Sequence, residues 1–402
     1  MLGKIEYAGG NHDSFEQAAD SLRRLADVEI GPKHVQRITC RLGRERADHR
    51  DRQVRALKDR RLVPVHVQPP TTVAIHLDAG KIQMRADDGR VGVREPHWRD
   101  TKAASLETYT TTARDTDPRP DPPEAFLDSV YVRRLCQEIA QVRGKPSTAP
   151  TAPKPSRCPR QCPDPPRPER LVRTAVATTG NAETFGWLVA AEATTRGFYG
   201  ARHKAVVGDG GNWIVPLTEL HFPGWRQVLD IVHLLSHLYA AATAAYPNHA
   251  HLAWRLYERM LRSAWAGNVP DVLTALTEQL ARLNGPPDDK QHPADNHPPP
   301  EGKRSAADLL QATRNYVTTN AARMEYPRYR REGLPVSSAP IESLIKQFND
   351  RVKGTEKFWN DGGGEAILQV RAAYLSQDGR AEDHYTRRPR PRAVGNHRLR
   401  IA

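Results

Sequence analysis

Helical periodicity dominates the pattern of hydrophobic positions at the start of the chain. Residues 14–27 place apolar side chains on one face of a helix, and Ser14 with Gln17 has the spacing of a capping box. The inward positions are Phe15, Ala18, Ala19, Leu22 and Leu25. The pattern therefore predicts that the first helix of the chain spans these residues.

A second helical segment opens at Pro32, after a glycine turn. Its inward positions are Val35, Ile38 and Leu42, and its outward face is basic. The outward residues that we expect to contact DNA are Lys33, Arg37 and Arg41. Two helices joined by a tight turn predict a helix-turn-helix-like DNA-binding region over residues 1–66. An ordinary helical hairpin with a solvated basic face is an equally good interpretation.

The hydrophobic period changes from helical to alternating at Thr72. Val73, Ile75 and Leu77 alternate with Ala74, His76 and Asp78, which predicts a half-buried strand. We expect the strand to end at Asp78 and to turn through Gly80 into a hairpin. On this pattern alone, the aspartate is an ordinary turn residue.

Later segments alternate between helical and strand patterns, which predicts a mixed α/β fold. Helices are expected over residues 123–142 and 182–196, and short buried strands at 205–207 and 228–229. Asp209 follows the first of these strands and precedes two glycines, a position where α/β folds expose groups to ligands. A turn-forming aspartate explains the same pattern equally well.

The segment at residues 145–169 is rich in proline and has no apolar period, so it predicts an extended or disordered linker. Cys158 and Cys162 lie within it. A structural zinc site needs four ligands, and the sequence has no second close cysteine pair. We interpret these cysteines as incidental linker thiols.

The region at residues 233–325 is predicted to be mainly helical, with helices over 238–283 and 305–323. Asp230, His233 and His237 precede or begin it and share one helical flank. Their spacing would allow metal binding, but the glutamate of a zinc-hydrolase motif and a third ligand are lacking. We interpret these three residues as DNA-contacting or structural.

The last patterned stretch combines interleaved basic and aromatic residues with an amphipathic helix after Pro340. The inward residues of this helix are Ile341, Leu344, Ile345, Phe348 and Val352. A neighbouring flank carries Glu342, Lys346, Asn349 and Lys353. Arg328 and Arg330, just before the helix, are further candidate DNA contacts. The simplest interpretation of Glu342 is a first-turn acid that favours the positive end of the helix.

Length and charge narrow the class of protein. The chain has 402 residues, with 60 Lys plus Arg against 47 Asp plus Glu and a net charge of +13. This length allows two or three domains, and the excess of positive charge suits a polyanionic partner. No run reaches the roughly 18 apolar residues of a membrane helix, and the N-terminus lacks the apolar core of a signal peptide. We therefore expect a cytoplasmic protein that acts on DNA.

The stretch from Met324 to Trp359 resembles the C-terminal signature of Kra-type insertion-sequence transposases. The matching residues are Met324-Glu325-Tyr326-Pro327-Arg328-Tyr329, Gly333-Leu334-Pro335, Ser337, Ile341-Glu342-Ser343, Lys346, Arg351-Val352-Lys353-Gly354 and Trp359. Two earlier blocks also resemble that family, namely Asp78 before Gly80 with Arg94-Glu95-Pro96, Trp98, Asp100 and Lys102, and Gly208-Asp209-Gly210 with Trp213-Ile214. Where the usual pattern reads Gly-Ser-Gly, this chain has Ser337-Ser338-Ala339.

The resemblance implies a DDE-class enzyme with an RNase H-like fold. Asp78, Asp209 and Glu342 would be its catalytic and metal-binding carboxylates, and Mg²⁺ or Mn²⁺ its cofactor. Its partners would be transposon-end and target DNA at the bacterial nucleoid, bound by a homo-oligomer. The RNase H-like core would comprise residues 67–144 and 170–232, followed by the helical insertion 233–325, a C-terminal catalytic helix region 326–378 and a basic tail 379–402.

Two alternatives to an active transposase remain open. An RNase H-like nuclease without strand transfer would use the same acids but would need no recognition of transposon ends. A truncated, inactive transposase would act only as a DNA-binding protein and would keep the basic helices. The two differ in their dependence on a divalent metal, because only the nuclease uses one.

Overall fold

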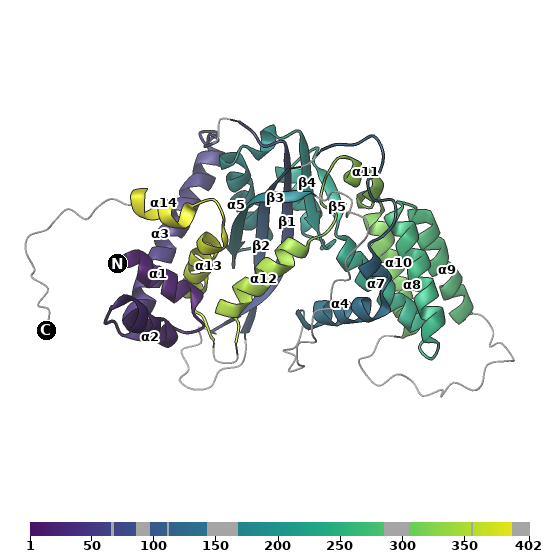
Figure 1. Cartoon of the computed structure of the whole chain (residues 1–402), viewed down its shortest axis with the longest axis horizontal. Helices are drawn as coiled ribbons and strands as arrows, with labels where there is room; N and C mark the ends of the chain where they lie inside the picture. The colour runs from purple at the N-terminus through teal and green to yellow at the C-terminus, as the bar shows by residue number, and fades with distance from the viewer. Residues whose placement is uncertain are drawn as a thin grey trace, which may run out of the picture.

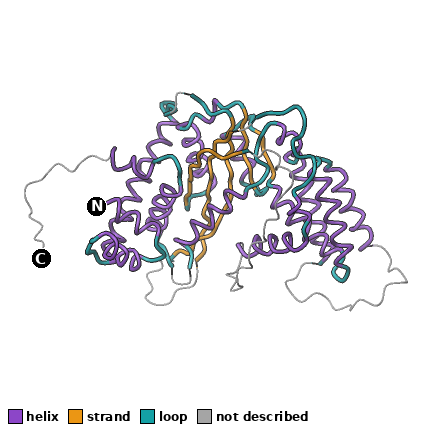
Figure 2. The backbone as a smooth tube through the Cα atoms, viewed as in Figure 1, coloured by secondary structure: helices purple, strands orange, loops and turns teal. Residues whose placement is uncertain are grey.

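The computed structural model describes residues 1–65, 68–85, 97–110, 112–142, 168–284, 305–354 and 357–387. The chain folds as a mixed α/β structure in which a five-stranded sheet lies between groups of helices (Figures 1 and 2). The mixed α/β class agrees with the sequence pattern. No helix in the described part of the chain has the length and apolar character required to cross a membrane.

The sheet has the strand order β3-β2-β1-β4-β5. Its strands are β1 (Thr72–Met84), β2 (His97–Thr110), β3 (Glu169–Thr178), β4 (His203–Gly208) and β5 (Arg226–Leu229). Strand β2 runs antiparallel to both β1 and β3, whereas β4 and β5 run parallel to β1. Strand β1 is therefore central and joins the antiparallel half of the sheet to its parallel half.

Strand β1 differs in two respects from the prediction. It is buried on both faces, because Ala74 and His76 are as inaccessible as Val73 and Ile75. It also continues past Asp78 to Met84 instead of turning, and Gly80 pairs with Thr101 of β2. The half-buried strand and the hairpin are therefore wrong. Helices cover both faces of the sheet, and the long partner strand β2 keeps β1 extended.

Three helices precede the sheet: α1 (Leu2–Asn11), α2 (Phe15–Ala26) and α3 (Pro32–Lys58). The predicted helix at 14–27 is confirmed as α2, and the Ser14 side chain accepts a hydrogen bond from the Gln17 amide at 3.0 Å. Helix α1 was not predicted, so α2 is the second helix of the chain. Leu25, expected to face inward, has 85% of its surface exposed.

Helix α3 connects the N-terminal helices to the sheet region. It is one continuous helix of 27 residues that packs against α13 (Asp361–Leu375) and α5 (Ala182–Thr195). Val35 and Leu42 are buried as predicted, and Lys33, Arg37 and Arg41 are exposed. Helices α1 to α3 therefore form a surface that is continuous with the rest of the fold.

The contact between α3 and α13 depends on Gly43. A Cβ atom at this position would lie 2.2 Å from the carbonyl oxygen of Ala366. We expect Gly43→Ala to lower the free energy of unfolding by about 1–3 kcal/mol, because the two backbones must move apart. Urea denaturation measures the loss. The control is Gly31→Ala, where a Cβ atom meets nothing within 4 Å; an equal loss in both variants would contradict the packing argument.

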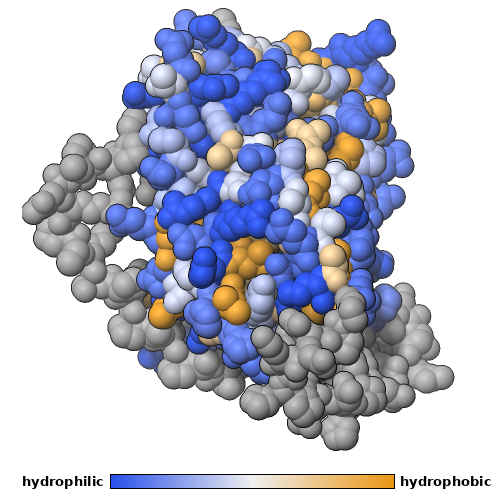
Figure 3. Space-filling model, turned by 90° about the vertical axis from the view of Figure 1, so that its right-hand side faces the viewer, coloured by the Kyte–Doolittle hydropathy of each residue, from blue (hydrophilic) through white to orange (hydrophobic). Residues whose placement is uncertain are grey.

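The remaining helices follow the predicted pattern in part. They are α4 (Ser129–Val142), α6 (Ile214–His221), α7 (Ile231–Ala245), α8 (Ala250–Trp265), α9 (Val269–Asn284), α10 (Ala306–Asn320), α11 (Tyr326–Arg331), α12 (Ala339–Val352) and α14 (Arg380–Arg387). Helices α7 to α10 stack beside the β5 edge of the sheet (Figure 1). The face of the molecule at this end is largely hydrophilic (Figure 3).

Several elements were missed or lie outside the described residues. The predicted helix over 123–142 is divided into a 3-10 turn at Glu124–Leu127 and α4. Strand β3 and helices α11, α13 and α14 were not predicted, and α14 occupies the start of the expected basic tail. Most of the proline-rich segment, both of its cysteines and the Arg94-Glu95-Pro96 block lie outside the described residues.

The two faces of the sheet are covered differently. Helices α5 and α6 pack on one face, where Val73, Ile75 and Leu77 point. On the other face, α7 and its neighbours form one hydrophobic cluster, whereas α12 and α13 form another. Ala74 belongs to the first of these clusters and Ile82 to the second. Asp78 lies between them on the same face of β1, at the boundary between the two groups of helices.

Candidate carboxylate site

Three aspartates occupy equivalent positions on three adjacent parallel strands. The last paired positions are Leu77 with Gly208 and Gly208 with Leu229. Asp78, Asp209 and Asp230 each come one residue later. Because neighbouring strands are about 4.8 Å apart, this register brings three residues that are distant in the sequence into one row. The strand pairing itself therefore builds an acidic edge.

Asp209 is close enough to Asp78 to change the pKa of Asp78. Burial, followed by the negative charge of Asp209, raises the pKa of Asp78 from 3.8 to about 7. Each carboxylate accepts one backbone hydrogen bond, Asp78 from the Ala79 amide at 2.7 Å and Asp209 from the Gly211 amide at 3.0 Å. These bonds orient the two side chains at the ends of the paired regions.

Helix α12 supplies the third carboxylate, Glu342. The buried residues Ile341, Leu344 and Ile345 hold the helix against the sheet, as the sequence predicted. The Glu342 side chain is 22% exposed, and its Oε1 atom is buried without a hydrogen-bond partner. Burial and the charge of Asp230 raise the pKa of Glu342. The charge of Glu342 in turn contributes to the raised pKa of Asp78, so the three predicted acids share one electrostatic environment.

Asp230 has a different role, because its hydrogen-bonding capacity is already used. It is fully buried and caps α7 by accepting from the amides of Val232 and His233, each at 3.1 Å. It also accepts from the Ser338 amide at 2.8 Å and from the Ser338 hydroxyl at 2.7 Å. Asp230 therefore attaches the turn before α12 to the start of α7, which fixes where Glu342 enters the site.

His233 places a positive charge beside the carboxylates. Its Nδ1 atom lies 2.6 Å from Asp230 Oδ2 and 3.8 Å from Glu342 Oε1. Burial lowers the pKa of His233, but the hydrogen bond to Asp230 and the charges of Asp230, Asp78 and Asp209 outweigh burial and raise the pKa to about 9. At neutral pH the imidazolium therefore offsets part of the negative charge of the site.

One group of described residues at this site has donor atoms that are close enough together to hold a metal ion. Donor atoms of Asp230, His233 and Glu342 all lie within 4.8 Å of one another. In that set, however, Asp230 and His233 are bonded to each other and to the backbone. The predicted acids Asp78, Asp209 and Glu342 do not gather within that distance, although their carboxylate oxygens are the ligands that Mg²⁺ and Mn²⁺ prefer. The Oε1 atom of Glu342 is buried without a hydrogen-bond partner, and a bound cation would satisfy it.

Residues of α10 border Asp209, and the sequence pattern had not predicted this contact. The Tyr316 hydroxyl donates to the Asp209 carbonyl oxygen at 2.8 Å, and the Tyr316 ring stacks on His237 at 4.1 Å between ring centres. Gly210 has φ +83°, and a Cβ atom there would lie 3.0 Å from Asn320 Oδ1. Gly210 is therefore required both for its backbone conformation and for the close approach of α10.

A buried polar network lies behind Asp78 on the same face of the sheet. His76 Nε2 is 3.0 Å from the Tyr109 hydroxyl, which donates to Glu107. The Ser105 hydroxyl also donates to Glu107, at 2.7 Å. Burial lowers the pKa of His76, so this imidazole is neutral at physiological pH. The network satisfies polar groups beneath the site and lies too deep to reach a macromolecular ligand.

The candidate DNA contacts near α12 differ in their exposure. Arg328 is partly exposed and pairs with Glu325 at 3.0 Å and Glu332 at 3.1 Å. Arg330 is buried, because its guanidinium binds Asp117 and lies over Trp265. The prediction that Arg330 faces DNA does not fit this placement, since a buried ion pair cannot reach a phosphate at the surface.

The two lysines predicted on the flank of α12 also differ from each other. Lys346 is exposed, and its Nζ atom lies 3.6 Å from Glu138 of α4. Helix α12 ends at Val352, so Lys353 lies just beyond it instead of on its flank. The Lys353 ammonium is 5.7 Å from the centre of the Trp98 ring. Both amines remain near the helix that carries Glu342.

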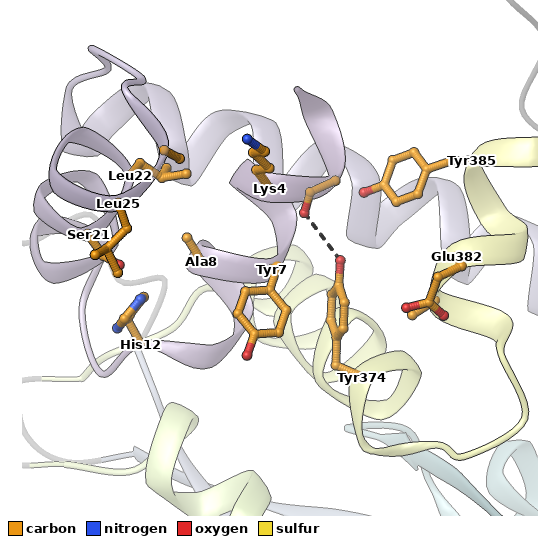
Figure 4. A pocket seen from close by; sticks show the side chains of 13 residues that line it. Lys4, Tyr7, Ala8, His12, Ser21, Leu22, Leu25, Tyr374, Glu382 and Tyr385 are labelled. Atoms are coloured by element: carbon orange, nitrogen blue, oxygen red, sulfur yellow. Dashed lines mark hydrogen bonds between the residues drawn. The ribbon is translucent and has the colours of Figure 1, made fainter.

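A separate apolar cavity of about 460 Å³ lies between α1, α2, α13 and α14. Tyr7, Leu25, Tyr374 and Tyr385 line it, as Figure 4 shows. The Tyr374 hydroxyl donates to the Gly3 carbonyl oxygen at 3.4 Å. The three predicted catalytic acids do not line this cavity.

Comparisons with models of known protein families and with curated proteins found no match. Asp78 of β1, Asp209 after β4 and Glu342 of α12 lie near enough to one another that the charges of Asp209 and Glu342 both raise the pKa of Asp78, and His233 lies 3.8 Å from Glu342. Carboxylate oxygens are hard ligands of the kind that divalent cations bind.

Proposed function

We propose that the chain is a DDE-class DNA transposase that cleaves transposon-end DNA and joins it to target DNA in a metal-dependent reaction. Asp78, Asp209 and Glu342 are its catalytic carboxylates. The observation that carries the proposal is the strand register that puts Asp78 and Asp209 at equivalent positions of β1 and β4, with Glu342 of α12 close enough for its charge to raise the pKa of Asp78. The sequence had singled out each of them within a different block.

The arrangement of the sheet supports an RNase H-like core. Asp78 lies within β1 and Asp209 directly follows β4, the adjacent parallel strand of a five-stranded mixed sheet, and the third acid comes from a helix packed on the same face. The helices α7 to α10 lie between the second and third acids in the sequence, where the resemblance places a helical insertion. Topology and site thus favour the same class of enzyme.

Asp78, Asp209 and Glu342 would hold Mg²⁺ or Mn²⁺. A bound pair of such ions supplies charge stabilisation to the attacking and leaving oxygens of an in-line displacement. The residues of the chain orient the ligands: the backbone amides of Ala79 and Gly211 fix the two aspartates, and the Asp230–Ser338 contact fixes the turn before Glu342. The His233 imidazolium moderates the repulsion among the acids.

The proposed reaction has two phosphoryl-transfer steps. Water first attacks the phosphorus at the transposon end, the bond from phosphorus to the 3′-oxygen breaks, and that oxygen leaves with a proton as a free 3′-hydroxyl. This hydroxyl then attacks a phosphodiester of target DNA and loses its proton, while the 3′-oxygen of the target strand leaves. Both steps are transesterifications or hydrolyses at phosphorus and require no redox cofactor.

The DNA partners are proposed to contact two basic surfaces. One is the exposed face of α3 with Lys33, Arg37 and Arg41. The other surrounds α12 and includes Arg328, Lys346 and Lys353, whereas the buried Arg330 is left out. Pairing of two transposon ends would bring together more than one copy of the chain, so we propose a homo-oligomer on DNA.

A strand-transfer assay separates the transposase from an RNase H-like nuclease. The wild-type chain is incubated with its element's labelled terminal duplexes and a supercoiled plasmid, in Mg²⁺, in Mn²⁺ or in EDTA. We expect nicked ends and labelled plasmid in the presence of either metal, and neither product in EDTA. Nicked ends without labelled plasmid would favour the nuclease. Binding without cleavage under all conditions would favour the inactive DNA-binding protein.

A further inference from the structure

Arg323 is a partly buried cation that has no partner among the residues that the structure describes. It forms no hydrogen bond, no ion pair within 4.0 Å and no ring contact with any residue that the structure describes. The other partly or fully buried arginines of the same part of the chain all have partners. Examples are Arg46 with Glu6, Arg226 with Glu332 and Arg380 with Glu192.

The position of Arg323 is set by helix α10, which borders the carboxylate site. Tyr316 bonds to the backbone of Asp209, and Asn320, one turn later, packs over Gly210. A 3-10 turn at Ala321–Arg323 follows directly, so Arg323 lies three residues after Asn320. Burial lowers the pKa of Arg323, and the charge of Asp209 is among the influences that oppose this effect.

An unpaired guanidinium in a partly buried position is unfavourable for the free protein. Removing water from a charged group costs free energy unless a counterion or hydrogen-bond acceptors replace it. The guanidinium carries five N–H donors in a planar fork, and that fork matches the non-bridging oxygens of a phosphate. A ligand that supplies such oxygens would satisfy Arg323 without displacing any existing contact.

We propose that Arg323 binds a backbone phosphate of the DNA strand that enters the carboxylate site beside Asp209. The inference rests on the proposed function for the identity of the ligand. It adds a residue that the sequence pattern had not marked and that no catalytic carboxylate motif includes. Arg323 contacts the substrate directly, and it places the strand next to the acids from the α10 side.

The first test measures DNA binding without catalysis. A fluorescein-labelled duplex is titrated with Arg323→Gln, Arg323→Lys and the wild type in EDTA at several salt concentrations. Loss of one phosphate contact should reduce the slope of log affinity against log salt by about 0.9 in Arg323→Gln, and lysine should restore most of it as a point charge. Arg314→Gln is the control, because Arg314 on α10 bonds to Thr277 and should leave the slope unchanged.

The second test separates ligand binding from a structural role. Arg323→Gln should keep or raise the melting temperature of the free protein, because it removes an unpaired charge from a partly buried position. Single-turnover cleavage in saturating Mn²⁺ should fall roughly 10- to 100-fold, because the strand is no longer held in line. A lowered melting temperature with an unchanged salt slope would overturn the inference.

Failure of the proposed function can be recognised independently. If the wild type binds the duplex with a salt dependence that Arg323→Gln reduces, but cleaves nothing in either metal, then Arg323 is a phosphate ligand in a protein that is not an active transposase. If cleavage proceeds and both the salt slope and the rate of Arg323→Gln equal those of the wild type, then the transposase proposal stands and the role of Arg323 is excluded.

Discussion

Glu342→Gln and Asp209→Asn are each expected to reduce metal-dependent cleavage of end DNA by about 10²- to 10³-fold or more. Each substitution keeps the size of the side chain and removes one negative charge from the shared environment of the three acids. A divalent cation then loses a ligand, and the charge that develops on the phosphate loses its stabilisation. Single-turnover cleavage of a labelled duplex in Mn²⁺ measures the loss, and calorimetry measures Mn²⁺ binding.

The matched control for Glu342 is Asp350→Asn on the same helix. Asp350 is exposed, so its removal should leave both Mn²⁺ binding and the cleavage rate unchanged. Glu342→Gln should retain the melting temperature of the wild type, because its Oε1 atom has no hydrogen bond to lose. Wild-type cleavage by Glu342→Gln would remove this residue from the catalytic set.

The pH dependence of stability in Asp78→Asn provides a second test of the same site. The folded-state pKa of Asp78 is about 7, above the ordinary value of 3.8, so the folded protein favours the protonated carboxyl. Without metal, the free energy of unfolding of the wild type should therefore decrease as the pH rises from about 4 to 7. Asp78→Asn should lack that decrease and be more stable than the wild type at pH 8. Divalent cations should reduce the difference in stability between Asp78→Asn and the wild type at pH 8, because they stabilise only the wild-type carboxylate.

The hydrophobic pattern was sufficient to locate the acids but not their supporting residues. Glu342 could be placed because a clear apolar stripe fixes which side of α12 faces the core. Asp209 could be placed because glycines follow a short buried strand. The bonds from Ser338 to Asp230 join residues that are far apart in the sequence, and nothing in either local pattern points to the other.

The errors in reading β1 have a physical origin. Alternation of large apolar residues with Ala74 and His76 is typical of a strand that has one face exposed to solvent. Here the small side chain of Ala74 fits beneath the helices, and the Nε2 atom of His76 bonds to Tyr109, so both faces of the strand are buried. Gly80 suggested a turn, but it lies within the strand, where a Cβ atom would come within 3.0 Å of Thr101 Oγ1 on β2.

Charge was the least reliable guide to surface residues. Arg330 lies in a run of basic residues that suggested a DNA contact, yet it is buried, pairs with Asp117 and packs over the Trp265 ring. Arg323, just before that run, was not predicted as a DNA contact, because a single arginine after a helix has no sequence signature. Its lack of a partner becomes visible only when the surrounding side chains are in place.

Asp230→Ala is expected to destabilise the protein by about 3–5 kcal/mol, because it leaves a buried positive charge unpaired. The aspartate is fully buried, receives four hydrogen bonds from the backbone and from Ser338, and pairs with His233. Urea denaturation in EDTA measures the change. The control is Asp128→Ala, since Asp128 makes a similar pair of bonds to the amides of Val130 and Tyr131 but is exposed. That variant should lose only about 1 kcal/mol.

The pH dependence of the conservative variant Asp230→Asn tests the charge pairing itself. Asp230 keeps His233 at a pKa of about 9, above the ordinary value of 6.5, so the stabilisation is fully present below pH 6.5 and is lost as the pH rises through 9. The pKa of Asp230 is lowered from 3.8 by His233 and Ser338, which outweigh burial, so its own contribution is lost only in acid. The stability difference between wild type and Asp230→Asn should therefore be largest between about pH 4 and 6.5 and should shrink towards pH 9. A difference that stays constant across this range would mean that Asp230 acts only as a helix cap and leaves His233 uncharged.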